Sequence, residues 1–176
     1  MKATSFEDFI KEVETGSYFD LYLIYNRKST DELNNQKNSL KYQKEQNLLF
    51  AKGNNLRVAN LTIEGFCRDG VIYEKHSAFK QDDLLIFNKD GTVQFSIERP
   101  KFQRLVELLN RRLFKGVIFL CWDRASRNPT DDLIIKRLIK MGVDVCFALA
   151  TYDKTSSGNL HQDVDSMFSI HHSLVS

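Results

Sequence analysis

Hydrophobic residues along this chain of 176 residues occur in two patterns, and their alternation predicts the secondary structure. Short continuous apolar runs, bounded by polar residues or glycine, predict buried strands. Apolar residues three or four positions apart predict amphipathic helices. The predicted strands cover residues 21–25, 56–63, 117–122 and 143–150. The predicted helices cover residues 5–15, 39–52, 100–113 and 128–142, and a last helix begins near Asn159 and runs to the end of the chain.

Residues with capping and turn preferences support several of these boundaries. Ser5 is a suitable N-cap for the first helix and Gly16 a suitable end. Asn128 and Pro129 are typical of the cap and first position of a helix. Residues 64–97 are the least regular part of the chain. Within them, residues 84–88 and 92–95 flank Lys89-Asp90-Gly91, which predicts a small hairpin.

Strands that alternate with helices predict an α/β fold. We expect a mainly parallel sheet of four to five strands, flanked by helices on both faces. The length is that of one domain with a full core. We expect residues 1–19 to form an N-terminal helical extension and residues 20–176 to form the main domain.

Composition narrows the classes of function. The formal net charge of +2 is too small to indicate DNA binding by the whole surface, so any DNA contact must come from a local cluster of basic residues. Cys67, Cys121 and Cys146 are odd in number and widely spaced, which predicts reduced thiols rather than a disulfide or zinc framework. The four histidines lack the spacing of metal ligands. With no signal peptide and no apolar run long enough to cross a bilayer, we expect a cytoplasmic protein without membrane contact.

Two loops that follow predicted strands are rich in groups that bind phosphate. The first contains Arg27 and Ser29, and the second contains Arg124 and Arg127. Because parallel strands end at the same edge of a sheet, we expect these loops to open side by side. Guanidinium groups stay ionised and bind phosphate oxygens in pairs of hydrogen bonds, so they stabilise charge that develops during phosphoryl transfer. The pattern therefore predicts Ser29 as a nucleophile among arginines.

Arg99 is a further candidate in a third segment. It precedes Pro100, which favours an extended backbone at the start of a helix. A cation at a helix N-terminus is unfavourable by a few tenths of a kcal/mol or more unless an anion accompanies it. A bound phosphate would remove this conflict.

Five motifs in register resemble the catalytic domain of the serine recombinases, the resolvase/invertase family. The resemblance covers about residues 20–176. In order, the motifs are Tyr25-x-Arg27-x-Ser29-Thr30, Ser39-Leu40-x-x-Gln43, Ser77, Arg99 and Asp123-Arg124-x-x-Arg127.

The resemblance implies a site-specific exchange of DNA strands that needs no metal, no ATP and no cofactor. Ser29 would attack the DNA phosphate and form a 5′-phosphoserine link. Arg27, Arg99, Arg124 and Arg127 would hold that phosphate. Asp123 would orient arginines or handle the leaving-group proton. Tyr25, Gln43 and Ser77 match supporting positions of the active site.

The resemblance also implies partners and context. Double-stranded DNA would be the substrate, and the full-length protein would associate into dimers and tetramers. We expect this chain to stop early in the long helix that builds those contacts, with the DNA-recognition region beyond residue 176. The resemblance further implies that the protein acts in a bacterial, plasmid, phage or other mobile-element context. The DNA sequence recognised, and the choice among integration, inversion and resolution, stay open.

Three other functions compete with this interpretation. A flavodoxin-like nucleotide-binding protein would share the sheet but should carry a glycine-rich phosphate loop, which the sequence lacks. A phosphatase or other hydrolase using Ser29 would need a base such as histidine, and neither loop contains one. A DNA-binding relative that has lost cleavage is the third alternative.

Overall fold

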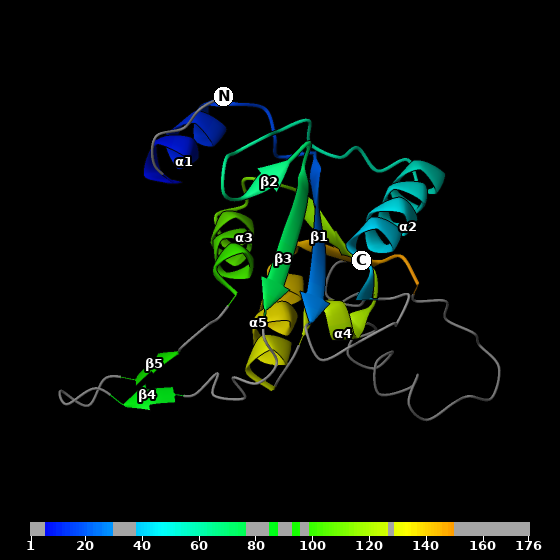
Figure 1. The fold of residues 1–176 in the computed structure, drawn as a ribbon. Helices are drawn as coiled ribbons and strands as arrows, with labels where there is room; N and C mark the ends of the chain where they lie inside the picture. Colours follow the sequence, from blue (N-terminus) through cyan, green and yellow to red (C-terminus); the bar gives the residue numbers. More distant parts are fainter. Residues whose placement is uncertain are drawn as a thin grey trace.

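The computed structural model describes residues 6–29, 38–76, 85–87, 93–95, 99–126 and 129–149 (Figure 1). In chain order its elements are α1 (Phe6–Thr15), β1 (Tyr22–Ser29), α2 (Leu40–Gly53), β2 (Cys67–Arg68), β3 (Val71–His76), β4 (Leu85–Phe87), β5 (Val93–Phe95), α3 (Pro100–Asn110), β6 (Gly116–Phe119), α4 (Trp122–Ala125), α5 (Pro129–Lys140) and β7 (Asp144–Phe147).

Five strands form one sheet in the order β2-β3-β1-β6-β7. The pairs β1–β3, β1–β6 and β6–β7 are parallel, and β2 adds an antiparallel edge to β3. Tyr25 in the central strand β1 is level with Ile72 of β3 and Phe119 of β6. The predicted class, a mainly parallel α/β sheet flanked by helices, is therefore confirmed.

Helices cover both faces of this sheet, as Figure 1 shows. On one face, side chains of α1, α3 and α5 pack with strand residues such as Leu23, Val117 and Val145. On the other face, α2 contributes Ala51 to a smaller cluster that includes Ile24. Successive residues of a strand point to opposite faces, so β1 serves both cores.

Local signals account for most element ends. The side chain of Ser39 accepts a hydrogen bond from Tyr42 N at 3.3 Å and so caps α2. Pro100 starts α3, where its missing N–H costs nothing. Gly142 ends the turn after α5 with a φ of 96°, a conformation that favours glycine.

One predicted strand is wrong. Residues 56–63 form only two isolated bridges, at Val58 and Ile63, because their backbone bonds go in turn to Tyr22, Gly70 and Cys67 rather than to one neighbouring strand. The strand beside β1 is instead β3, in the stretch that the sequence suggested was irregular. Its pattern was hidden by Glu74, a charged residue that is nevertheless 3% exposed because its carboxylate is hydrogen-bonded.

The hairpin, the third predicted strand and the last predicted helix have different outcomes. The hairpin is confirmed as β4 paired with β5. The strand expected over residues 117–122 ends at Phe119, and Trp122 instead begins the short helix α4. The last helix, from near Asn159, lies outside the described residues. Among the helices that the structure describes, none is long and apolar enough to span a membrane.

Candidate active site at the ends of strands β1 and β6

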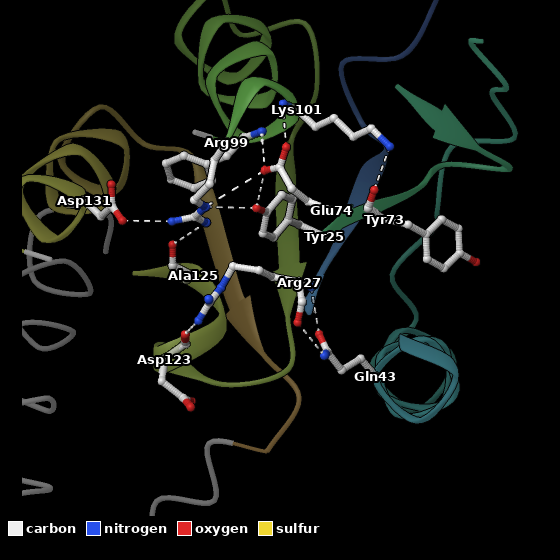
Figure 2. Close-up of polar contacts among 11 residues, drawn as sticks. Tyr25, Arg27, Gln43, Tyr73, Glu74, Arg99, Lys101, Asp123, Ala125 and Asp131 are labelled. Atoms are coloured by element: carbon white, nitrogen blue, oxygen red, sulfur yellow. Dashed lines mark hydrogen bonds and ion pairs between the residues drawn. The ribbon is translucent and has the colours of Figure 1, made fainter. Parts of the chain in front are cut away.

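The carboxyl ends of β1 and β6 lie where the connections of the chain diverge. From β1 the chain passes over one face of the sheet through α2, and from β6 it passes over the other face through α5. Ligands of open parallel sheets bind at such a divergence. Arg27 lies near the end of β1, and Asp123 lies in α4, directly after β6 (Figure 2). The two segments expected to open side by side therefore lie together, but Arg27 lies within β1, which runs to Ser29 rather than ending at Tyr25, and Arg124 lies in α4 rather than in a loop.

Arg27 and Arg124 contact each other's segments. The Arg27 guanidinium donates from Nη2 to the backbone oxygen of Asp123. In return, Arg124 Nη1 lies 3.5 Å from the backbone oxygen of Arg27 and 3.3 Å from Asn38 Oδ1. Arg27 is 5% exposed and Arg124 is fully buried. These contacts join β1, α4 and the start of the α2 region into one unit.

Gln43 holds the backbone of Arg27 in place of a missing strand. Ile24 N donates to Gly70 O on the β3 side, so Arg27, three residues later, directs its backbone groups toward the β6 side. There β6 has already ended at Phe119. The buried side-chain amide of Gln43 replaces it: Oε1 accepts from Arg27 N at 3.0 Å, and Nε2 donates to Arg27 O at 2.8 Å.

A second amide pair binds α2 to β1 one turn further along. Asn47 Nδ2 donates to Asn26 Oδ1 at 2.8 Å, and both residues are fully buried. Together with Gln43, this pair fixes α2 against the end of β1. Buried side chains that are hydrogen-bonded to each other specify one alignment of the two elements.

Asp123 differs from the arginines in being exposed. Its side chain is 62% exposed, and Oδ2 lies 3.8 Å from Arg124 Nη2. The Cys121 thiol donates to Asp123 Oδ1 at 2.7 Å. The contacting trio of Arg27, Arg124 and Asp123 carries two positive charges and one negative charge. Guanidinium groups in such surroundings attract an anion, because low-dielectric walls strengthen electrostatic interactions.

Arg99 lies in a separate buried cluster. Its Nη1 donates to Asp131 Oδ2 at 2.8 Å, its Nη2 to Ala125 O at 3.0 Å, and its Nε to the Tyr25 hydroxyl at 3.1 Å (Figure 2). Glu74 Oε1 lies 4.0 Å from Arg99 Nε. The conflict between a cation and a helix N-terminus is thus relieved by carboxylates of the protein itself.

Glu74 and Asp131 were not among the candidates from the sequence. Glu74 accepts from the Tyr25 hydroxyl at 2.6 Å and from two N-terminal amides of α3, Lys101 N at 2.8 Å and Phe102 N at 3.1 Å. It therefore caps α3 from a neighbouring strand. The sequence feature that could have indicated a buried Glu74 is its position two residues after the apolar pair Val71-Ile72, which is typical of a strand.

Tyr25 stands at the centre of this cluster. Burial raises the pKa of its hydroxyl well above the ordinary value, the nearby charge of Arg99 lowers it, and Glu74 raises it again. The hydroxyl therefore stays protonated, donating to Glu74 and accepting from Arg99. Tyr25 precedes Arg27 by two residues, so the cluster reaches the strand that carries the candidate phosphate ligand.

Three candidates from the sequence, Ser29, Ser77 and Arg127, lie partly or wholly outside the described part of the structure. Ser29 is the last residue of β1, and its backbone is level with His76 of β3; its side chain lies outside the described part of the structure. Ser77 and Arg127 lie outside the described residues altogether. Across the residues that the structure does describe, no group of three or more His, Cys, Asp or Glu side chains is arranged to hold a metal ion.

Comparisons with known proteins match a family model and several solved structures. The family model described as "Resolvase, N terminal domain" matches residues 72–174, more than half of the chain; β1 lies outside the matched range. A solved structure, described as the C-terminal catalytic domain of ISC1926 TnpA, an IS607-like serine recombinase, is 19% identical to this chain with a TM-score of 0.44. The comparison covers 83% of this chain and 79% of that one. No curated protein matches.

Proposed function

This chain belongs to the family of resolvase N-terminal domains, and from that premise we propose that it is the catalytic domain of a site-specific DNA recombinase. The observation that carries the proposal is that Arg27 donates to Asp123 O while Arg124 Nη1 lies 3.5 Å from Arg27 O, which brings both guanidinium groups to the end of β1. Ser29, the proposed nucleophile, ends the same strand two residues after Arg27. Buried guanidinium groups beside a hydroxyl suit phosphoryl transfer.

The proposed reaction is a transesterification. The Ser29 oxygen attacks the phosphorus of a DNA phosphodiester and loses its proton as the new P–O bond forms. The bond from phosphorus to the 3′ oxygen breaks, and that oxygen leaves as a 3′ hydroxyl after taking up a proton. The DNA 5′ end is then held as a phosphoserine. Attack by a different 3′ hydroxyl reverses these steps and rejoins exchanged strands, so no ATP is needed.

In this proposal Arg27, Arg124 and Arg127 bind the non-bridging oxygens of the phosphate. Their charge offsets the negative charge that increases in the transition state, which is the part usually supplied by a metal ion. Asp123, exposed beside Arg124, orients that arginine or exchanges a proton with the reacting oxygens. Gln43 positions Arg27 through its backbone, Tyr25 positions it through β1, and Ser77 is proposed as a supporting residue.

The proposal includes the assembly and setting of the full-length protein. Double-stranded DNA is the substrate, and dimers that pair into tetramers bring two DNA sites together. Residues 1–19 are a helical extension of a catalytic domain that spans residues 20–176. A bacterial cytoplasm, in the context of a mobile element, is the setting in which such an activity on DNA would operate.

A covalent-capture experiment tests the proposal. The full-length protein is incubated with fragmented DNA of its source, and protease-sensitive protein–DNA adducts are separated on a denaturing gel. We expect an adduct with the wild type, with Ser17→Ala as a matched control, and in excess EDTA. We expect none with Ser29→Ala. An adduct that persists in Ser29→Ala refutes the assignment of the nucleophile, and DNA binding without any adduct supports the alternative of a non-cleaving relative.

A further inference from the structure

Arg99 uses all three of its side-chain nitrogens inside the protein. Nε, Nη1 and Nη2 each donate a hydrogen bond, to the Tyr25 hydroxyl, Asp131 Oδ2 and Ala125 O respectively, at distances of 2.8–3.1 Å. Each of these acceptors belongs to a different element: β1, α5 and α4. The guanidinium therefore acts as a three-way connection between elements.

Aromatic rings cover the same guanidinium. Its central carbon lies 3.9 Å from the centre of the Phe102 ring and 5.3 Å from the centre of the Tyr25 ring. Arg99 is 1% exposed, as deeply buried as Arg124, so its partners rather than its burial set it apart. A DNA phosphate reaches this group only if Asp131 or one of the other acceptors is displaced.

The charge of Arg99 is also compensated by the protein. Asp131 forms a close ion pair with it at 2.8 Å, and Glu74 adds a second carboxylate at 4.0 Å. Both carboxylates lie at helix N-termini, Glu74 at α3 and Asp131 in the first turn of α5, where negative charge is favoured. The carboxylate that contacts Arg124, that of Asp123, lies further away at 3.8 Å and is 62% exposed, so this ion pair is weaker than the buried pair of Arg99 and Asp131.

We infer that Arg99 does not bind the DNA phosphate and is instead a positioning residue, held by Glu74 and Asp131. Its bond to Ala125 O fixes α4 at the residue next to Arg124. Its bond to Tyr25 fixes β1 two residues before Arg27. Arg99 thereby sets the relative placement of Arg27 and Arg124, two of the three arginines that the proposed function assigns to the phosphate. This inference rests on that proposed function and replaces the expectation that Arg99 is a phosphate ligand.

Asp131 separates the two roles, because they predict opposite results for Asp131→Asn. If Arg99 were a phosphate ligand, removing the carboxylate that competes for it would leave cleavage unchanged or increase it. If Arg99 is a positioning residue, loss of its strongest partner slows cleavage. Asp131 itself has no favourable interaction to offer a phosphate, since like charges repel.

The test uses the full-length protein and the duplex recovered by covalent capture. Single-turnover adduct formation and DNA affinity are measured for Asp131→Asn, Arg99→Lys, Glu74→Gln and the double variant Asp131→Asn/Arg99→Lys. Every assay is run well below the thermal midpoint of each variant, so that a loss of stability alone does not change the rate. The control is the exposed ion pair between Arg111, the residue that follows α3, and Glu14 of α1, tested as Arg111→Lys and Glu14→Gln.

We expect each single variant of the cluster to cleave at least 10-fold more slowly, with DNA affinity within about twofold of the wild type. We expect the double variant to be no slower than the slower single variant, because all act through one unit. The control variants should cleave within twofold of the wild type.

Two results overturn the inference. If Asp131→Asn cleaves as fast as the wild type while Arg99→Lys is slow, Arg99 is a phosphate ligand. If all folded cluster variants cleave at the wild-type rate, the cluster is only structural. Glu74→Gln provides the same test if Asp131→Asn does not fold. Ser29→Ala, run in parallel, keeps the two proposals distinct, since an adduct in that variant refutes the proposed function itself.

Discussion

Replacing Gln43 with methionine removes the side-chain amide that takes the place of a strand beside Arg27. Methionine has nearly the same length and volume, so the packing of α2 on the sheet is retained. What is lost is the acceptor for Arg27 N at 3.0 Å and the donor to Arg27 O at 2.8 Å. Both backbone groups lie in a buried part of the molecule.

The expected loss of stability follows from these contacts. A buried N–H without an acceptor costs about 1–3 kcal/mol. The Arg27 oxygen loses less, because Arg124 Nη1 still lies 3.5 Å away. We therefore expect Gln43→Met to lower the free energy of unfolding by about 2–3 kcal/mol, a large part of the 5–15 kcal/mol typical of a domain.

Equilibrium unfolding in urea, followed by circular dichroism, measures this loss. Gln46→Met is the matched control, since Gln46 is half-buried on the same helix; its effect should stay within about 0.5 kcal/mol. We further expect Gln43→Met to slow adduct formation by the full-length protein, because Arg27 is no longer fixed. A change in unfolding free energy below about 0.5 kcal/mol for Gln43→Met would refute the assigned role of the amide.

Two further predictions concern the sheet and the response to alkali. At Gly116, an added Cβ would lie 1.9 Å from Asp144 O, so Gly116→Ala should separate β6 from β7 and cost about 3 kcal/mol or more in urea unfolding. Gly53→Ala, where the Cβ meets nothing within 4 Å, should be neutral or slightly stabilising; equal effects at both sites would contradict the argument. Burial raises the pKa of the Cys67 thiol from 9.0 to about 11, so the folded state favours the neutral thiol. The resulting stability is complete below pH 9 and is lost as the pH rises toward 11, by about 2 kcal/mol at pH 10.5. Cys67→Ala should flatten this decline between pH 8.5 and 10.5, and an unchanged decline would exclude Cys67 as its source.

The sequence predicted the architecture because that information is local. Helix α3 follows from apolar residues at helical spacing, and the ends of α2, α3 and α5 follow from Ser39, Pro100 and Gly142. The apolar runs that became β1, β6 and β7 were equally visible. Alternation of these elements is enough to predict a parallel sheet, and the geometry of parallel strands then brings Arg27 and Arg124 to the same edge.

The strand next to β1 could not be assigned in this way. β3 contains Glu74 and Lys75 and so lacks the apolar pattern of a central strand. Residues 56–63 have that pattern but form only isolated bridges. Burial of Glu74 becomes favourable only because Tyr25 and the start of α3 supply hydrogen bonds to it, and those partners lie far away in the chain.

Arg27, Arg99 and Arg124 looked equivalent in the sequence, since each was a basic residue at the end of a predicted element. Their partners distinguish them, and these partners are separated by 16 residues for Arg27 and Gln43 and by 32 residues for Arg99 and Asp131. Local patterns of charge and hydrophobicity carry no information on such pairs. The sequence by itself thus determined the sheet, its helices and the edge where the arginines gather. Only the tertiary structure decided that Arg99 is paired with two buried carboxylates, because the cost of burying a charge depends on the groups that surround it in space.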